Sequence, residues 1–409
     1  MKILLIGGTG ILSANIRDLA IERGHDVYIL NRGINKVKNT NGKVKNIISD
    51  IRDREQANKD LHDFYFDVVV DFISFNIDEL KNTLSIVQNK CHQFIFISSA
   101  TVYRDTIAGE KITEDFETSN PDWEYAAHKI DCENYLKNNF TTTKMKYTII
   151  RPYVTYSDAR IPFAVIPPRS QWTLADRIKN KRPVILWDNG QAICTLTYSK
   201  DFAVGVVGLF ANEKALNETF HITTDYTLTW AEALKYIAAA LGENNVLAAD
   251  IPSSYIARKM PGLKGELFGD KARNREFNND KIKGAVKDFS ARTTFQEGIK
   301  HTIQFYKKNA YMQEIDYSWN ARVDKLILEY YKENGISNTM VISAIKNRDF
   351  MKSLNYKNRL VYTMSFYDGT YKLYTLAHRI KAKIRYTLQK RKSLKKGHSK
   401  GRDKNDSNT

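Results

Sequence analysis

The chain begins with MKILLIGGTGILS (Met1–Ser13), in which a short apolar run leads directly into a glycine cluster. The run KILLI has the branched, apolar content of a buried strand, and the amphipathic stretch from Ile11 to Arg23 predicts a helix. A strand, a glycine turn and a helix in this order bring backbone N–H groups close to a ligand at the positive end of the helix. The opening stretch therefore predicts a site for a phosphate-bearing ligand, and a dinucleotide pyrophosphate suits it.

The glycines of this stretch have distinct expected roles. Gly7, Gly8 and Gly10 supply the tight turn and the close approach of the backbone to the pyrophosphate. Ser13 stands where the third glycine of such a fingerprint falls, and its side chain is small enough for helix–strand packing. The predicted dinucleotide-binding residues of the turn are Gly7, Gly8, Thr9, Gly10, Ile11 and Leu12.

The first 150 residues alternate β-branched runs with amphipathic stretches such as Tyr125 to Lys137, and this predicts a parallel sheet covered by helices on both faces. Beyond Pro152 the pattern loosens, which favours a smaller substrate-capping lobe. We predict a Rossmann-type doubly wound α/β fold, with a catalytic domain over 1–330 divided near 155 into a cofactor-binding and a substrate-binding part. The predicted strands are KILLI (Lys2–Ile6), HDVYIL (His25–Leu30), KNIIS (Lys45–Ser49), FDVVVDFI (Phe66–Ile73), QFIFIS (Gln93–Ser98) and KYTII (Lys146–Ile150).

Two strand ends bear on the identity of the dinucleotide. Asn31 and Arg32 follow the second strand, where a carboxylate would accept hydrogen bonds from the adenosine ribose and repel a 2′-phosphate. The chain has no carboxylate there, and an arginine attracts that phosphate, so we predict NADP, with NAD as the alternative. Asp50 and Ile51 end the next strand and are expected to meet the adenine.

A catalytic set is predicted from three residues. Ser99 follows the strand QFIFIS within SSATVY, and Tyr125 and Lys129 form a Y-x-x-x-K pattern on the next helix. Residues four apart share a helix face, so we expect the Lys129 ammonium to lower the pKa of Tyr125. Such a tyrosine can exchange a proton with an alcohol or carbonyl while a nicotinamide exchanges hydride, and a serine hydroxyl can hold the same oxygen.

Over about residues 1–310, these motifs together resemble the extended short-chain dehydrogenases/reductases, the NAD-dependent epimerase/dehydratase group. Other segments in family order are IRPYVTYS (Ile150–Ser157), TLTYSKDFAVGVVGLF (Thr195–Phe210) and ETFHITTDYTLTWAEAL (Glu218–Leu234). The resemblance implies that Ser99, Tyr125 and Lys129 are catalytic, and it also implies a homodimer. It further implies residues that line the nicotinamide side, namely Phe72, Ile73, Ser74 and Tyr153.

Departures from the family pattern bear on the substrate. Ala100 and Thr101 stand where the similar dehydratases carry an Asp-Glu pair, so dehydration is disfavoured. Val154 and Cys194 replace two polar groups that hold a nucleotide sugar in the similar epimerases. We therefore expect an oxidoreductase or epimerase for a hydroxyl or keto group of a nucleotide-activated sugar or related polyol, in surface polysaccharide or sugar metabolism. The candidate substrate residues are Thr101, Arg160, Arg169, Arg177, Lys271 and Arg273.

The charge distribution bears on an alternative interpretation, a non-catalytic RNA-binding protein similar to the chloroplast stem-loop binding proteins, which share the fold and the N-R-G strand end. The formal net charge is +17, but residues 331–409 hold 19 Lys and Arg against 5 Asp and Glu, which leaves the body at +3. A near-neutral body offers RNA no basic groove. The complete set of Ser99, Tyr125 and Lys129 favours the enzyme.

The basic extension, residues 331–409, predicts a different partner, an anionic membrane surface bound through residues 373–396. The alternatives are a helix packed on the catalytic body and nucleic acid, and residues 395–409 are expected to be disordered. Three well-separated cysteines indicate reduced thiols in a cytosolic protein without a metal site. We therefore expect the extension to bind the inner face of the membrane. The apolar stripe of this extension is Leu373, Leu376, Ala377, Ile380, Ile384 and Leu388.

Overall fold

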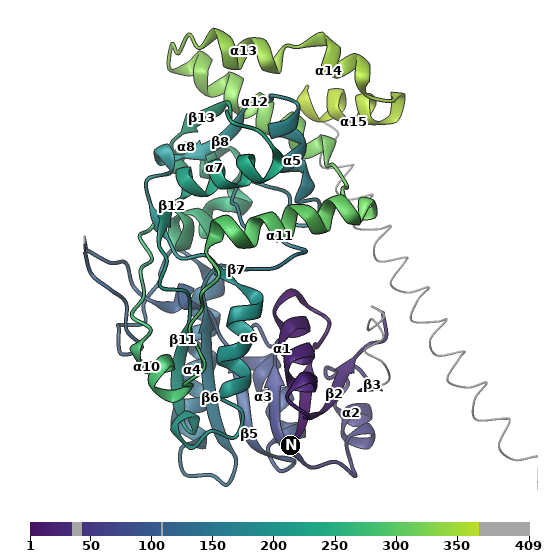
Figure 1. Cartoon of the computed structure of the whole chain (residues 1–409), viewed down its shortest axis with the longest axis vertical. Coiled ribbons are helices and arrows are strands. Elements are labelled where there is room, and N and C mark those ends of the chain that lie inside the picture. Colours follow the sequence, from purple (N-terminus) through teal and green to yellow (C-terminus); the bar gives the residue numbers. More distant parts are fainter. Residues whose placement is uncertain (35–42, 108, 368–409) are drawn as a thin grey trace, which may run out of the picture.

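The computed structural model describes residues 1–34, 43–107 and 109–367, and a seven-stranded parallel sheet forms its lower half in Figure 1. The strand order is β11-β6-β5-β4-β1-β2-β3. This order reverses between β1 and β4, which is where doubly wound sheets bind ligands beside the carboxyl ends of their strands. The predicted Rossmann-type fold is thus confirmed. The strands are β1 (Lys2–Ile6), β2 (Asp26–Asn31), β3 (Val44–Ile48), β4 (Phe66–Asp71), β5 (Cys91–Ile97), β6 (Lys146–Pro152) and β11 (Glu218–Ile222).

The central strands of the sheet are apolar because helices cover both of its faces, whereas the edge strand β3 is partly exposed. In β1, the four residues Ile3–Ile6 are fully buried and alternate between two separate cores. All six strands predicted from the sequence are present. The seventh strand, β11, pairs with β6 at the edge, and its Thr219 and His221 are as buried as its apolar residues.

Helices α1 (Ile11–Glu22) and α6 (Ser199–Gly208) pack together on one face of the sheet. Helices α2 (Arg54–Asp60), α3 (Ile77–Val87) and α4 (Glu124–Phe140) cover the other face. The side chain of Asn76 caps α3 by accepting a hydrogen bond from the N–H of Glu79 at 3.0 Å. Each of these helices begins at the carboxyl edge of the sheet, so the helix starts surround the switch point.

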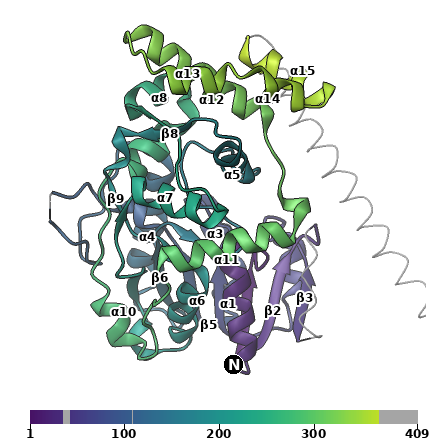
Figure 2. The same cartoon turned by 45° about the horizontal axis from the view of Figure 1, so that its top comes forward.

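A second core lies above the carboxyl edge of the sheet, and α11 runs between the two parts in both views (Figures 1 and 2). It contains three two-stranded sheets and most of the remaining helices. Its strands are β7 (Thr155–Tyr156), β8 (Val184–Trp187), β9 (Ile193–Cys194), β10 (Thr197–Tyr198), β12 (Leu228–Thr229) and β13 (Ala248–Ile251). Its helices are α5 (Trp172–Lys179), α7 (Trp230–Leu241), α8 (Ser253–Lys259), α9 (Lys264–Glu266), α11 (Phe295–Lys308) and α12 (Tyr317–Glu333), while α10 (Asp280–Ala285) packs beside β11.

The chain continues after α12 into α13 (Thr339–Ile345), α14 (Arg348–Ser353) and α15 (Tyr356–Phe366), at the top of Figure 1. Helix α15 packs on α12, and the Tyr362 hydroxyl donates a 2.6 Å hydrogen bond to the buried carboxylate of Asp324. The domain boundary that we predicted at residue 330 falls within α12. This helix contributes core residues both before and after residue 330. The basic segment 373–396 and the predicted disordered end lie outside the described residues.

The three cysteines are all buried. Cys91 and Cys132 lie in the core beneath α3 and α4, and Cys194 lies in the second core. Burial raises the pKa of the Cys91 and Cys132 thiols to about 12. These thiols therefore act as small apolar core groups. In the part of the chain that the structure describes, no helix has the length and apolar content needed to cross a membrane.

Candidate active site

A cavity of about 400 Å³ opens at the carboxyl edge of the sheet, at the switch point between β1 and β4. The turn after β1, the first turn of α1 and the ends of β2, β4 and β5 form its walls. Most of the residues predicted to bind a dinucleotide meet here. The lining residues are Gly7, Thr9, Gly10, Ile11, Leu12, Ser13, Leu30, Asn31, Arg32, Ile34, Ser49, Asp50, Ile51, Arg52, Phe72, Ile73 and Ile97.

The glycine turn is built so that its backbone forms the cavity wall. Gly7 has a φ of +87°, and a Cβ atom at this position would lie 2.3 Å from the side chain of Ile73. A side chain is therefore excluded both by backbone strain and by contact. The hydroxyl of Ser13 accepts a 2.8 Å hydrogen bond from the N–H of Gly10 and donates one of 3.1 Å to the carbonyl of Gly7. Ser13 thus fixes the turn, beyond the packing role that its size predicted.

The end of the cavity near β2 and β3 carries two arginines. Asn31 is held by hydrogen bonds to Asn46 at 2.8 Å and from the N–H of Gly33 at 2.7 Å. Arg32 is exposed and lines the cavity. Arg52, which the sequence analysis missed although it directly follows Asp50-Ile51, lines the cavity as well, and Glu79 accepts its hydrogen bonds at 2.8 and 3.1 Å.

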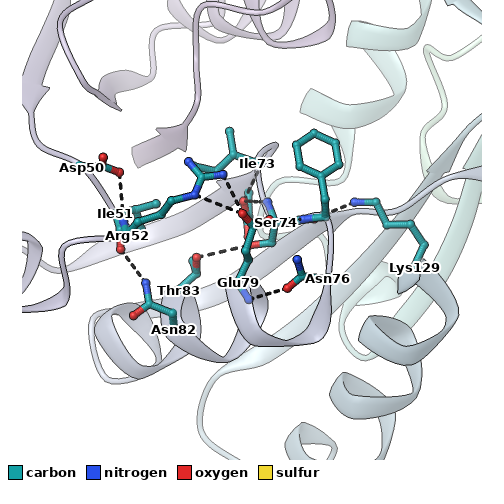
Figure 3. Close-up of polar contacts among 12 residues, drawn as sticks. Asp50, Ile51, Arg52, Ile73, Ser74, Asn76, Glu79, Asn82, Thr83 and Lys129 are labelled. Carbon is teal, nitrogen blue, oxygen red and sulfur yellow. Dashed lines mark hydrogen bonds and ion pairs between the residues drawn. The ribbon is translucent and has the colours of Figure 1, made fainter. Parts of the chain in front are cut away.

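Lys129 lies near the other end of the cavity, away from these arginines and next to the carboxyl ends of β4 and β5 (Figure 3). Its Nζ donates 2.8 Å hydrogen bonds to the carbonyl oxygens of Ser74 and Ile97, and Ile97 lines the cavity. The side chain is 2% exposed. Burial lowers the pKa of Lys129 to about 8, and the nearby carboxylate of Asp71 opposes this effect.

Tyr125 lies one helix turn before Lys129, and Ser99 lies beside it. The oxygen of Ser99 accepts hydrogen bonds from the hydroxyl of Thr101 at 2.9 Å and from its N–H at 3.3 Å. Burial raises the pKa of Tyr125, while its hydrogen bond with Ser99 lowers it. The raised pKa differs from our expectation, because burial outweighs the other effects and Lys129 Nζ lies 5.9 Å from the centre of the tyrosine ring.

Asp71, the last residue of β4, is a second residue that the sequence analysis missed. Its carboxylate accepts hydrogen bonds from the N–H groups of Ile73 at 2.9 Å and Ser74 at 3.1 Å, which shapes the turn that lines the cavity. Glu79 holds the same turn through the N–H of Phe75 at 2.9 Å (Figure 3). A carboxylate at the end of an apolar strand is the signal that could have revealed Asp71.

The candidate substrate residues fall into different surroundings. Thr101 contacts Ser99 directly. Arg160 lies close enough to Tyr125 for its charge to lower the pKa of that residue. Arg169 is exposed before α5, and Arg273 forms a 2.5 Å ion pair with Asp122 beside the start of α4.

Two of the predicted residues lie elsewhere than expected. Arg177 is 3% exposed in α5 and is held by Asp324, Asn320 and the carbonyl of Pro183, so our prediction that it binds substrate is wrong. It is a core residue because α5 faces α12. Tyr153 is not among the residues that line the cavity, and its ring packs against that of Phe277 at 5.3 Å.

The cavity fits a dinucleotide in three respects. Its wall is glycine backbone at the N-terminus of a twelve-residue helix, where pyrophosphates are stabilised. The buried hydroxyl of Ser49 lines it and has no hydrogen-bond partner among the described residues. Its apolar end, formed by Phe72, Ile73 and Ile97, adjoins Lys129 and suits an aromatic ring.

Several known proteins are similar to this chain in sequence or in fold. A chloroplast stem-loop binding protein of 41 kDa b, from Arabidopsis thaliana, is 26% identical over 253 residues, which cover 59% of this chain and only 63% of that protein. The UDP-glucose 4-epimerase of Thermus thermophilus, solved with NAD, has a TM-score of 0.61 and 20% identity over 75% of this chain and 99% of its own. The UDP-glucuronic acid 4-epimerase of Bacillus cereus, solved with UDP-glucuronic acid and NAD, has a TM-score of 0.62 and 16% identity over 76% of this chain and 100% of its own.

The family assignment follows from a match to a protein-family model. The model of the NAD dependent epimerase/dehydratase family matches residues 3–223, which span the sheet from β1 to β11, and so more than half of the chain. This chain therefore belongs to the NAD-dependent epimerase/dehydratase family of extended short-chain dehydrogenases/reductases.

Proposed function

We propose that this protein is an NAD(P)-dependent oxidoreductase or epimerase that acts on a hydroxyl or keto group of a nucleotide-activated sugar or related polyol. The observation that carries the proposal is that Lys129 donates a hydrogen bond to Ile97, which lines the cavity, while Tyr125 lies one helix turn before Lys129 and forms a hydrogen bond with Ser99. A proton-exchanging group beside a nicotinamide site is what hydride transfer to or from a carbon–oxygen bond requires.

Each of the three residues has a distinct role in the proposal. When bound, the nicotinamide supplies a hydride acceptor or donor. Tyr125 gives a proton to the substrate oxygen or removes one from it. Ser99 accepts hydrogen bonds from Thr101, so its own hydrogen is left to donate to the oxygen of Tyr125 or of the substrate. Lys129 places its ammonium at the carboxyl ends of β4 and β5, where it binds the nicotinamide ribose.

NADP is the preferred cofactor in the proposal. Arg32 lines the cavity at the end of β2, and Asn31 beside it carries no charge. A guanidinium at this point attracts a 2′-phosphate, whereas a carboxylate would repel it. Arg52 adds a second guanidinium, although Glu79 offsets much of its charge.

The two residues that follow Ser99 bear on the type of reaction. Ala100 and Thr101 carry neither a carboxylic acid nor a carboxylate, so the two positions after Ser99 provide no acid–base pair for eliminating water. Oxidation and reduction at one carbon need only Tyr125 and the cofactor.

Incubation with nucleotide sugars tests the proposal. The purified protein is mixed with NADP or NAD and with UDP-glucose, dTDP-glucose or UDP-glucuronic acid, and reduced nicotinamide and changes of sugar configuration are followed by absorbance and NMR. We expect turnover or cofactor reduction with at least one sugar, and none in Tyr125→Phe. Mass spectrometry of ligands retained during purification identifies sugars outside this panel. A protein that retains and converts no sugar contradicts the proposal.

A second candidate function is supported by the similarity to the chloroplast stem-loop binding protein. Under this alternative the chain binds RNA hairpins without catalysis. The affinity for a labelled RNA hairpin at rising salt concentration tests it, because phosphate contacts give a steep dependence on salt. Tight binding that is unchanged in Tyr125→Phe, together with no sugar turnover, would favour this alternative.

A further inference from the structure

A second group of buried polar side chains lies beside Tyr125, outside the cofactor cavity. The hydroxyl of Tyr153, the Oδ1 atom of Asp270 and the Nε atom of Arg275 have no hydrogen-bond partner among the described residues. These residues are 6%, 3% and 0% exposed. A buried polar atom without a partner costs stability, so several in one place indicate groups kept for a ligand.

Asp270 belongs to a single turn of π-helix, Leu267–Lys271, which is a rare element often found at functional sites. Hydrogen bonds link this turn to the proposed catalytic residues. The side-chain amide of Asn120 donates hydrogen bonds to the carbonyls of Thr101 at 2.6 Å and Gly269 at 2.8 Å. Since Thr101 contacts Ser99, one amide links the π-turn to the catalytic serine.

Trp123 packs against the same turn. A Cβ atom at Gly269 would lie 2.7 Å from Cβ of Trp123, so only glycine allows this approach. The indole ring of Trp123 in turn packs against the ring of Tyr125 at 5.1 Å. The π-turn and the catalytic tyrosine therefore share one packing partner.

The charged side chains and rings around Asp270 form a buried cluster of polar and aromatic groups. Lys271 forms an ion pair with Asp270, and its Nζ lies 5.7 Å from the ring centre of Tyr153 and 5.6 Å from that of Trp230. The indole N–H of Trp230 also lacks a hydrogen-bond partner among the described residues. The charge of Asp270 raises the pKa of both Tyr125 and Tyr153, as expected for a carboxylate near both phenols.

We propose that Asp270 and Lys271 bind hydroxyl groups of the sugar or polyol moiety that presents its reacting carbon to Tyr125. This inference rests on the proposed function and names the part of the substrate that the π-turn recognises. A carboxylate accepts hydrogen bonds from neighbouring hydroxyls, and an ammonium donates to their oxygens.

Titration calorimetry with nucleotide sugars and with the bare nucleotides tests this proposal. UDP-glucose, dTDP-glucose, UDP-glucuronic acid, UDP and dTDP are titrated into the NADP-loaded protein. We expect a neutral sugar to add affinity over its bare nucleotide in the wild type. Asp270→Asn should reduce that added affinity by about ten- to hundredfold, the scale of one hydrogen bond to a charged group, without changing the affinity for the nucleotide.

Two further variants guard against a folding defect. Asp270→Asn leaves Lys271 unpaired, so the double change Asp270→Asn with Lys271→Met removes both charges, and it should lose the same sugar affinity. Asp280→Asn, at the exposed start of α10, is the matched control and should keep it. Unchanged NADP affinity and unfolding temperature show that each variant is folded.

The failure of this inference is distinguishable from failure of the proposed function. If the wild type converts a sugar through Tyr125 while Asp270→Asn and the double variant keep full sugar affinity, the subsite is wrong and the enzyme remains. If no sugar binds the wild type more tightly than its bare nucleotide, the subsite is wrong together with the proposed substrate class.

Discussion

Lys129 donates a 2.8 Å hydrogen bond from its Nζ to the carbonyl oxygen of Ile97, the last residue of β5. The ammonium therefore lies at the carboxyl edge of the sheet and within the wall of the dinucleotide cavity, since Ile97 lines that cavity. Burial at this point lowers the pKa of Lys129 to about 8, below the value of 10.5 for a lysine in water.

The lowered pKa predicts how stability depends on pH. Below pH 8 the ammonium is charged in both the folded and the unfolded states, and its burial costs the folded state stability. Between pH 8 and 10.5 the folded protein has lost this proton while the unfolded chain keeps it, so the free energy of unfolding rises with pH. Relative to Lys129→Met, the cofactor-free wild type should gain about 3 kcal/mol across this window.

Urea denaturation at several pH values measures this difference. Lys144→Met, at an exposed position after α4, is the control and should show no such gain. If the difference between wild type and Lys129→Met stays constant from pH 8 to 10.5, Lys129 is not a buried group that titrates in this range.

Cofactor choice gives a second prediction, which depends on Arg32 at the end of β2. Arg32→Ala should weaken NADP binding by about 1–3 kcal/mol, the range for one charge-assisted contact, and leave NAD binding nearly unchanged. Fluorescence titration with both cofactors measures this, with Arg54→Ala at the exposed start of α2 as the control. A wild-type protein that binds NAD more tightly than NADP would overturn the assignment.

A third prediction concerns the buried ion cluster that joins α5 and the C-terminal helices. Asp324 is fully buried and accepts hydrogen bonds from Arg177, Arg182 and Tyr362. Asp324→Asn should destabilise the fold by about 3–5 kcal/mol in urea denaturation, because it leaves two buried guanidinium groups without a counter-charge. Asp349→Asn, on the exposed side of α14, should change stability little. Equal effects of the two changes would show that the cluster contributes little.

Membrane attachment is a fourth prediction, and it rests on the sequence of residues 373–396. Flotation with phosphatidylglycerol vesicles compares the full chain with a version that ends at Tyr367. The cut belongs there rather than near residue 330, because Tyr331 and Tyr362 are buried in the described core. We expect the full chain alone to float at low salt, at about 1 kcal/mol per basic residue near the surface. If both versions stay in the soluble fraction, the attachment hypothesis fails.

The cofactor half of the molecule could be predicted from sequence because its signals are local. The run KILLI, the glycines after it and the strand ends at Asn31 and Asp50 each mark a chain segment, and parallel pairing brings their ends to one edge. The edge strand β11 was missed because its polar Thr219 and His221 interrupt the apolar pattern. The role of Ser13 in fixing the turn also depends on atoms that only the folded backbone brings together.

The substrate side could not be predicted in the same way. Sequence alone does not distinguish Arg177 from Arg160. The packing of α5 on α12 makes Arg177 a core residue, whereas Arg160 lies near Tyr125. Asp270 gave no signal at all, because a π-turn has no sequence pattern and its contacts with Trp123 and Asn120 span about 150 residues of chain. Burial likewise reversed the expected direction of the pKa shift of Tyr125.

Single-turnover kinetics of Tyr125→Phe test the central claim most directly, that Tyr125 exchanges the proton while the dinucleotide cavity holds the hydride carrier. The change removes one oxygen atom and leaves the ring that packs on Trp123. With a sugar that the wild type converts, we predict that Tyr125→Phe loses hydride transfer to or from bound nicotinamide, while its NADP affinity stays within a few fold. Hydride transfer at the wild-type rate in Tyr125→Phe would contradict the account.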